Sequence, residues 1–464
     1  MKQIPIGIAV VFLSSLAAAQ PLSCVGQVAG TPPVRSTGIT EKAGDILVIC
    51  NGGIPTPAGN PVPTVDLTVS LAPAVNITAR TWLGNASEAL LLVDEPQPAH
   101  QVACPAASTC ALHGVAGGIQ YGVPSSPGNG GQHVRNVYQA NAPSGSSITI
   151  AGVPFDPPGP TAVRFLRIAN LFFNAAQLNV PAGSGVPVVA TLSSTGGVNL
   201  NIQTFFPLTV AAAIPPLDTA LLDGAGVPSS LITLSNRSGN NVPLANSPFA
   251  AAAPDGVTFH ARAQERFPAV LRVRNGNNWP SPDSEPPLMP QSDTGALYSS
   301  ETGFYNPSFP LLGGLRTAGL ASRGTRLVVR FSGVPSGVKL YVPVRTVGSA
   351  GKPSMRLVLS PPNGNTGSLF LPAPAASPVG GGIVPLIGCP TTCYAVYEVT
   401  TADSTAIESA DVPVYLAYRP NSPLGTISFD VSLGSTSGQA TAVGQGLPRF
   451  APSPGPPVPA VRIQ

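Results

Sequence analysis

The stretch VDLTVSL, residues 65–71, alternates apolar and polar side chains with a period of two. In an extended chain its four apolar residues point to one face and its three polar residues to the other. A strand with one buried face and one solvated face has this pattern. It recurs in ISFDVSL (427–433) and VNLNIQ (198–203), whereas no stretch combines sustained helical spacing with helix caps. The sequence therefore predicts an all-β fold.

The composition agrees with a folded protein of short strands. Charged residues make up 9% of the chain, against about a quarter in ordinary globular proteins. Disorder would require few apolar residues and a high net charge, but the chain is 43% hydrophobic with a net charge of +3. Its 50 Gly and 55 Pro residues are therefore interpreted as turns between strands. Because no Lys/Arg cluster is available to neutralise phosphates, a nucleic-acid partner is not expected.

Strand and turn signals predict two or three β-sandwich (Ig-like) domains in tandem, with long Pro/Gly-rich loops. The first boundary is the Pro-rich break PFDPPGP (154–160). Residues 275–320 have little strand pattern and are interpreted as a long loop of the second sandwich. The predicted units are residues 20–156, 157–320 and 321–450, followed by a Pro-rich tail, 451–464, that is expected to be frayed.

The N-terminus has the order of a secretory signal. A positive start at Lys2 is followed by an apolar run, residues 6–16, and by three alanines ending at Ala19. We expect cleavage after Ala19, which makes residues 1–19 a signal peptide. Lipidation of Cys24 is disfavoured because the residues before it fit a lipoprotein signal poorly. No later stretch is long and apolar enough for a membrane helix, so the chain is predicted to be secreted, periplasmic or at the cell surface.

Six cysteines in an exported chain predict disulfides. Six cysteines allow 15 connectivities, but their clustering along the chain favours Cys24–Cys50, Cys104–Cys110 and Cys389–Cys393. The last pair lies in CPTTC, whose three intervening residues differ from the two of a thioredoxin-like redox motif. We expect structural bridges.

The spacing His100-x3-Cys104-x5-Cys110-x2-His113 offers four ligands of the types that zinc accepts in a tetrahedral site. An oxidising compartment removes the thiolates that zinc needs, so a disulfide with two incidental surface histidines is the favoured interpretation. We therefore predict no metal site.

Polar and aromatic residues are concentrated in the stretch 275–310. Paired carboxylates beside aromatic side chains are what sugar hydrolysis requires, and the same groups can bind sugars, or calcium through oxygen ligands. The alternative is a loop that wraps over a neighbouring domain with its aromatic residues as packing anchors. The candidate ligand-binding residues are Trp279, Asp283, Glu285, Glu301 and Tyr305, in a stretch that also contains Asn275, Asn277, Asn278, Asp293 and Phe304.

Basic side chains alternate with apolar ones on three predicted strands. The pairs are His260 and Arg262, Arg272 and Arg274, and Arg326 and Arg330. If these strands were neighbours, their polar faces would form a patch able to bind an anionic polymer. The interpretation that we favour is that these residues form the solvated faces of sheets.

Three stretches, SEALLLVDEP (87–96), SSETGFYNP (299–307) and ASRGTRLVVRFSGVPSGV (321–338), resemble an uncharacterised family of large exported Pro/Gly-rich all-β proteins of soil bacteria, with no assigned activity. The resemblance touches all three predicted units. It implies a bacterial envelope or extracellular protein and supplies no catalytic residue.

Motifs of common enzymes are missing from the sequence. GSTSG (434–438) has Thr where a G-x-S-x-G elbow has its Ser, and no H-E-x-x-H, EF-hand loop or P-loop occurs. We therefore expect an exported, non-catalytic structural or adhesion protein without a cofactor. Its partner is open, with glycans and other envelope proteins as candidates. The alternative is a carbohydrate-binding or glycan-hydrolysing protein that uses residues 275–310.

Overall fold

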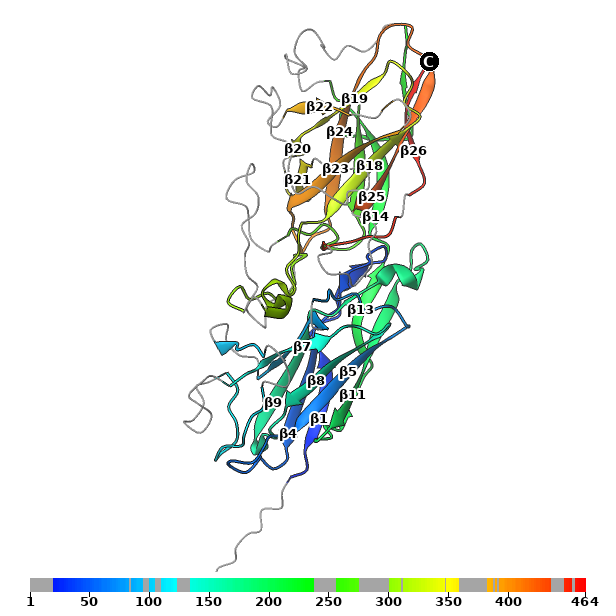
Figure 1. Cartoon of the computed structure of the whole chain (residues 1–464). Helices are drawn as coiled ribbons and strands as arrows, with labels where there is room; N and C mark the ends of the chain where they lie inside the picture. Colours follow the sequence, from blue (N-terminus) through cyan, green and yellow to red (C-terminus); the bar gives the residue numbers. More distant parts are fainter. Residues whose placement is uncertain are drawn as a thin grey trace, which may run out of the picture.

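The alternating stretches assemble into two β-sandwiches that follow one another along the chain (Figure 1). The computed structural model describes residues 20–82, 85–94, 100–104, 110–122, 134–237, 256–274, 300–309, 312–346, 348–358, 382–386, 389, 392–434, 446–452 and 455–464. The described elements are strands and short 3-10 helices, which confirms the all-β class. Figure 1 shows the sandwiches stacked end to end, with the N-terminal one (blue to green) below the C-terminal one.

The N-terminal sandwich consists of two main sheets. One contains, in spatial order, β12 (Ile202–Gln203), β1 (Ser23–Val28), β4 (Ile46–Gly52), β9 (Gly159–Ala169), β6 (Ala86–Val93) and β7 (Val137–Asn141). The other contains β2 (Pro33–Arg35), β13 (Leu208–Ile214), β11 (Val186–Gly196), β5 (Thr64–Ala72) and β8 (Ser147–Pro154). A short pair, β3 (Glu41–Lys42) and β10 (Phe172–Phe173), stands apart from both sheets. VDLTVSL lies in β5, with its four apolar residues buried and its three polar residues half-buried, as the period predicts.

The C-terminal sandwich also consists of two sheets. One contains β15 (Pro228–Ser229), β14 (Leu217–Asp223), β17 (Phe259–Glu265), β24 (Ser409–Ala417), β19 (Lys339–Pro343) and β22 (Ile383–Pro385). The other contains β16 (Ile232–Leu234), β26 (Val458–Ile463), β25 (Gly425–Gly434), β18 (Arg326–Ser332), β23 (Thr392–Thr401), β21 (Ser354–Leu357) and β20 (Arg345–Thr346). The sheets meet at buried aromatic residues, among them Phe259 and Phe429, whose rings stack at 5.9 Å.

The strand pairings do not follow the predicted unit boundaries, and they group the described strands into two sandwiches. Strands on either side of the predicted boundary at 156/157 pair within the same sheets, β4 with β9 and β5 with β11. β17 and β24 likewise pair across the boundary predicted at 320/321. The Pro-rich break joins β8 to β9 inside one sandwich, where the Asp156 carboxylate accepts backbone hydrogen bonds from Thr56 and Ile119. The proline-rich run 154–160 marks a change of sheet, and the change of sandwich falls at Pro215–Pro216, between β13 and β14.

Two local expectations also differ from the structure. The tail predicted to be frayed contributes β26, which lies between β25 and β16 and buries Ala460, Val461 and Ile463. Pro459 lies beside a shift in the register of this strand, a place where a missing N–H is tolerated. Of the stretch VNLNIQ only the last two residues form a strand, β12.

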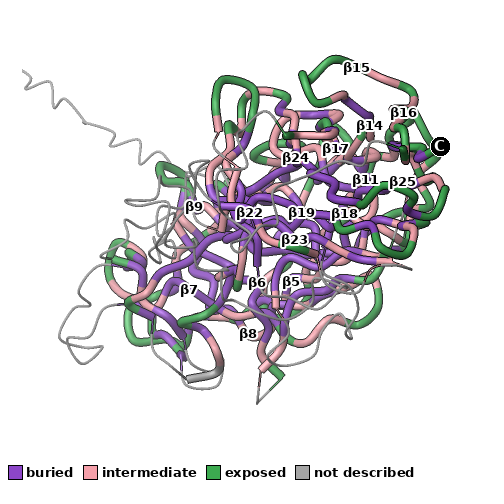
Figure 2. Tube along the Cα trace, turned by 90° about the horizontal axis from the view of Figure 1, so that it is seen from above, coloured by how far each residue is buried: buried purple, intermediate pink, exposed green. Residues whose placement is uncertain are grey.

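Burial follows the strands, and exposed residues lie mainly in the peripheral turns (Figure 2). β6 has two buried faces. Leu91 and Val93 point into the N-terminal core, whereas Leu90 and Leu92 pack against Phe304 and other residues that follow β17 in the chain. Residues 300–309, called the junction segment below, thus cover the outer face of this sheet. This second contact explains why the apolar run of β6 does not alternate.

Candidate functional site

The five candidate ligand-binding residues fall into two groups. Trp279, Asp283 and Glu285 lie outside the described residues. Glu301 and Tyr305 belong to the junction segment and are each only 6% exposed. Because both are buried where the two sandwiches meet, neither side chain is on a surface that a glycan can reach.

Glu301 is held by Arg35, the last residue of β2. Arg35 Nη1 donates to Glu301 Oε1 at 2.6 Å, and Nη2 donates to Oε2 at 3.0 Å. The Nε of the same guanidinium donates to Glu41 Oε1 at 2.8 Å. One fully buried arginine therefore binds two carboxylates, a geometry that the planar fork of its donors favours.

Thr325 extends this network into the C-terminal sandwich. Its hydroxyl donates to Glu301 Oε1 and accepts hydrogen bonds from Arg35 Nη1 at 3.0 Å and from the backbone N–H of Arg272 at 2.9 Å. Arg35 Nη1 also donates to the carbonyl of Val270 at 3.1 Å. The network thus joins β2, the junction segment and the loops that precede β18. We call these four residues, Arg35, Glu41, Glu301 and Thr325, the junction network.

The contacts of the junction network favour the ionised forms of Glu301 and Arg35. Burial raises the pKa of Glu301, but the charges of Arg35 and Arg272 and the hydrogen bonds from Arg35 and Thr325 together outweigh burial and keep this pKa below its ordinary value. Burial lowers the pKa of Arg35, yet Glu301 and Glu41 together raise it above the ordinary value. A general acid or base needs a pKa near the working pH and contact with the substrate. Glu301 has neither, so its role is structural.

The aromatic part of the junction segment serves as a packing anchor. The backbone N–H of Phe304 donates to Asn170 Oδ1 at 2.8 Å, and Asn170 Nδ2 donates back to the Phe304 carbonyl at 2.9 Å. Asn170 directly follows β9 of the N-terminal sandwich. For the described end of the stretch 275–310, the alternative of a loop wrapped over a neighbouring domain is the one that the structure supports.

The cysteines form the three predicted disulfides, Cys24–Cys50, Cys104–Cys110 and Cys389–Cys393. The second bridge consumes both sulfur atoms of the candidate zinc constellation, so the zinc interpretation is wrong. Within the described ranges, no group of three or more His, Cys, Asp or Glu side chains is arranged to hold a metal ion.

The arginines expected on solvated strand faces are bound to carboxylates or carbonyls. Arg262 contacts both oxygens of Asp411, Arg326 contacts Glu398, and Arg330 contacts Asp430. Arg272 and Arg274 donate to the carbonyls of Ala269 and Ala321, and His260 Nδ1 lies 2.9 Å from the carbonyl oxygen of Asp223. Arg272 and Arg326 are buried, so for these two the solvated-face interpretation is wrong. Since every arginine of the set has such a partner, they do not form a free basic patch.

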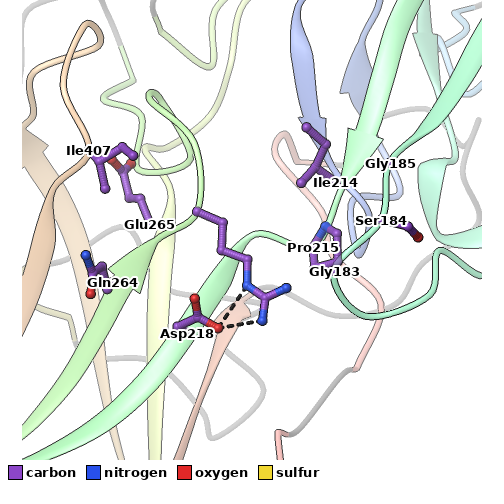
Figure 3. A pocket seen from close by; sticks show the side chains of 10 residues that line it. Gly183, Ser184, Gly185, Ile214, Pro215, Asp218, Gln264, Glu265 and Ile407 are labelled. Atoms are coloured by element: carbon purple, nitrogen blue, oxygen red, sulfur yellow. Dashed lines mark hydrogen bonds and ion pairs between the residues drawn. The ribbon is translucent and has the colours of Figure 1, made fainter.

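An open cleft of about 510 Å³ lies where the two sandwiches face each other (Figure 3). In Figure 3, Gly183, Ser184, Gly185, Ile214 and Pro215 line one side, and Asp218, Gln264, Glu265 and Ile407 line the other; Arg266 completes the lining. Sequence reasoning missed this cleft, because its residues come from distant turns and strand ends that share no motif.

Two acidic residues of the cleft differ in environment. Asp218 is ion-paired with Arg266 and has a side chain that is 58% exposed. Glu265 is buried, and its carboxyl group accepts hydrogen bonds from the backbone N–H groups of Leu271 at 2.6 Å and Glu408 at 2.8 Å. Burial raises the pKa of Glu265 to about 7.

Phe205 and Phe206 form an exposed aromatic pair between β12 and β13, with exposed fractions of 73% and 81%. Single exposed apolar residues are common, whereas adjacent large ones are typical of contact surfaces. The sequence contains this pair without any surrounding pattern that distinguishes it from a core segment.

Among the described residues, no helix has the length and apolar character to cross a membrane. The sequence matches no protein-family model and no curated protein. Among solved structures, the chain is similar to the C-terminal domain of the Streptococcus agalactiae AgI/II polypeptide BspA, with 10% identity, a TM-score of 0.30, and coverage of 94% of this chain and 99% of that chain.

Two further solved structures are similar at the same low level. The C-terminal domain of the Streptococcus pyogenes antigen I/II-family protein AspA has 8% identity and a TM-score of 0.28, over 95% of this chain and 98% of that chain. The CupB6 tip adhesin from Pseudomonas aeruginosa has 9% identity and a TM-score of 0.15, over 96% and 99%. Scores this low do not establish a common fold, so function has to be inferred from the residues of this chain.

Proposed function

We propose that this chain is an exported, non-catalytic protein of the bacterial envelope or extracellular space, with a structural or adhesion role. The observation that carries the proposal is the junction network. Arg35, Glu41 and Glu301 are charged groups buried against each other between two sandwiches, and their contacts hold those sandwiches in one arrangement. A fixed end-to-end arrangement of β-sandwiches suits a protein that spaces or presents surfaces.

Export is supported by the cysteines and by the N-terminal sequence. Three disulfides account for all six cysteines, and such bridges persist in oxidising compartments. Residues 1–19 have the charged, apolar and small-residue order of a signal peptide. Together these features favour a location outside the cytoplasm.

The use of the ionisable side chains supports a non-catalytic role. Glu301 is bound by Arg35, Asp411 by Arg262 and Glu398 by Arg326. In these pairs a carboxylate and a guanidinium neutralise each other between neighbouring strands or segments. These three pairs therefore do not offer acid–base catalysis, which requires two groups whose pKa values differ and which face a bound substrate.

The experiment compares cells that express the gene with cells from which it is deleted. We expect the protein to be accessible to added protease on intact cells or to be present in the medium, with its cysteines unreactive to alkylating agents until a reductant is added. We also expect the deletion to reduce attachment to surfaces or cell–cell cohesion, and the wild-type gene to restore it. Mature protein in the cytosol with free thiols, or hydrolysis of a glycan by the purified chain, would contradict the proposal.

The variant Glu301→Ala tests whether attachment depends on the arrangement of the sandwiches or only on the presence of the protein. Glu301→Ala leaves a buried arginine with one carboxylate fewer and is expected to loosen the junction. If the fixed arrangement of the sandwiches matters, complementation with this variant restores export but not attachment. Full restoration of attachment by Glu301→Ala would show that the arrangement is unimportant.

A further inference from the structure

In the cleft between the sandwiches, the ion pair of Asp218 and Arg266 uses only one of the two carboxylate oxygens. Arg266 donates from both Nε, at 2.8 Å, and Nη2, at 2.5 Å, to the same oxygen, Oδ1 of Asp218. In the neighbouring pair on β17 and β24, Arg262 instead uses both oxygens of Asp411. Asp218 Oδ2 and Arg266 Nη1 therefore remain as an acceptor and a donor at the wall of the cleft, and both side chains are partly exposed.

Apolar surface lies close to this donor and acceptor. Ile407 is 50% exposed and offers apolar surface to the cleft. Ile214 and Pro215 line the opposite side, as Figure 3 shows. With a volume of about 510 Å³, the cleft has the size of small-ligand sites, which combine apolar lining with a few placed polar groups.

The ion pair at the wall of the cleft selects for a neutral ligand, since Glu265, the other acidic residue of the lining, is buried with both carboxyl oxygens bonded to backbone N–H groups. An anion would be attracted to Arg266 but repelled by Asp218 beside it, and a cation would meet the reverse. A neutral group with an adjacent donor and acceptor avoids both penalties. Neighbouring hydroxyl groups of a sugar meet this requirement, since one can donate to Asp218 Oδ2 and the other can accept from Arg266 Nη1. The C–H face of the same sugar ring would pack on Ile407.

A peptide is a less suitable occupant because the nearby strand edges are taken. β13 is hydrogen-bonded to β11 and β2, and β17 is hydrogen-bonded to β14 and β24. β14 has an open side along residues 217–220, but this side is opposite β17 and so faces away from Gln264 and Ile407. A bound peptide would therefore lose the main-chain ladder on which strand addition depends.

We infer that the cleft between the sandwiches binds a neutral oligosaccharide segment of one or two sugar units, held by Asp218 and Arg266 and packed on Ile407. This ligand class deepens the adhesion role proposed above and rests on that role for its biological meaning. Binding is measured on the purified chain, so failure of sugar binding and failure of cell attachment are separate results.

The experiment is saturation-transfer NMR and calorimetric titration of the purified full-length mature protein with a panel of neutral oligosaccharides, uronic-acid oligosaccharides and short peptides. We expect at least one neutral oligosaccharide to bind. Arg266→Gln and Asp218→Ala should each weaken binding about tenfold or more, since each removes a charge-assisted hydrogen bond. Ser184→Trp, which places a large side chain on the cleft wall and leaves the ion pair intact, should abolish binding.

Arg330→Gln is the matched control. Arg330 is also paired with an aspartate, and its side chain is 34% exposed, against 30% for Arg266, but it does not line the cleft. This variant should bind within about twofold of the wild type, as expected for a distant and independent site. The inference is overturned if no neutral oligosaccharide binds, if only the charged sugars or peptides bind, or if Arg266→Gln and Ser184→Trp bind like Arg330→Gln.

Discussion

Arg35 and Glu301 are 266 residues apart in the sequence and form a two-point ion pair at the centre of the junction between the sandwiches. Arg35 belongs to β2 of the N-terminal sandwich. Glu301 belongs to the junction segment, which follows β17 of the C-terminal sandwich. Both side chains are buried, with exposed fractions of 0% and 6%. Buried charges of this kind are tolerated only with partners, so each residue makes the other necessary.

Glu301→Ala should therefore destabilise the protein strongly. The substitution leaves the Arg35 guanidinium buried with Glu41 as its remaining carboxylate, and breaking a buried pair in this way costs about 3–5 kcal/mol. Urea unfolding followed by circular dichroism measures the loss. Because the pair joins the sandwiches, we also expect the wild type to unfold in one transition and the variant to unfold in two.

Asp218→Ala serves as the control for Glu301→Ala. The ion pair of Asp218 with Arg266 lies at the surface, with side chains that are 58% and 30% exposed, and pairs of this kind contribute about 0–1 kcal/mol. A loss of similar size in the two variants would mean that the buried pair does not hold the sandwiches together.

Glu265 should make stability depend on pH in a direction opposite to that of most carboxylates. Burial raises its pKa to about 7 from an ordinary value of 4.5. Between these values the folded state holds a proton that the unfolded state has released, so the free energy of unfolding falls as pH rises through this window. The effect is on the order of 2–3 kcal/mol.

Glu265→Gln isolates this contribution, because the amide does not titrate. The free energy of unfolding is measured for both proteins at about pH 4 and about pH 8, on either side of the window. The wild type should lose more stability than the variant between these two pH values. Parallel pH profiles would show that Glu265 titrates normally.

The alternation of side chains was sufficient to predict the strands but not their grouping. VDLTVSL and ISFDVSL lie in β5 and β25 because a period of two leaves one face for the core. The end of each sandwich has no comparable signal. The break PFDPPGP is as rich in proline as a linker, yet it lies inside a sandwich, whereas the true connector contains only Pro215 and Pro216.

The candidate site could be predicted in part, for a related reason. The clustering of the cysteines identified their pairing, since partners lie 4, 6 and 26 residues apart. Glu301 was predicted to be a ligand-binding residue of a long loop, but its partner Arg35 is far away in sequence and lies in a strand of three residues. The stretches 87–96, 299–307 and 321–338 meet at the junction, since Leu90 and Leu92 pack against Phe304 and Thr325 binds Glu301. No local sequence pattern predicts that these distant stretches are in contact.

The disulfides should differ in their contribution to stability. Cys24–Cys50 has a sequence separation of 26 residues and Cys104–Cys110 one of 6. In the chain-entropy description, the longer loop contributes about 3–4 kcal/mol and the shorter one about 2–2.5 kcal/mol. We therefore expect the double variant Cys24→Ala/Cys50→Ala to melt at a lower temperature than Cys104→Ala/Cys110→Ala. The reverse order in differential scanning calorimetry would contradict this account.

Gly314 should be irreplaceable because of its contact with Trp82. It lies in η6 (Leu312–Thr317) with φ of +70°, and a Cβ atom there would be 2.0 Å from the Trp82 ring. Gly314→Ala therefore forces η6 away from the N-terminal sandwich or turns the indole ring, at a cost of about 1–3 kcal/mol beyond the backbone penalty. Gly351→Ala is the control, because Gly351 has φ of +75° with no atom within 4 Å of its added Cβ. This control therefore carries only the backbone penalty of about 1 kcal/mol.

The chain has two tryptophans, so in a Trp279→Phe background the emission of Trp82 reports on the contact between Gly314 and Trp82 directly. We expect Gly314→Ala to shift that emission to longer wavelength as the ring becomes more exposed, and Gly351→Ala to leave it unchanged; an identical spectrum and equal stability for the two variants would mean that η6 does not pack on Trp82.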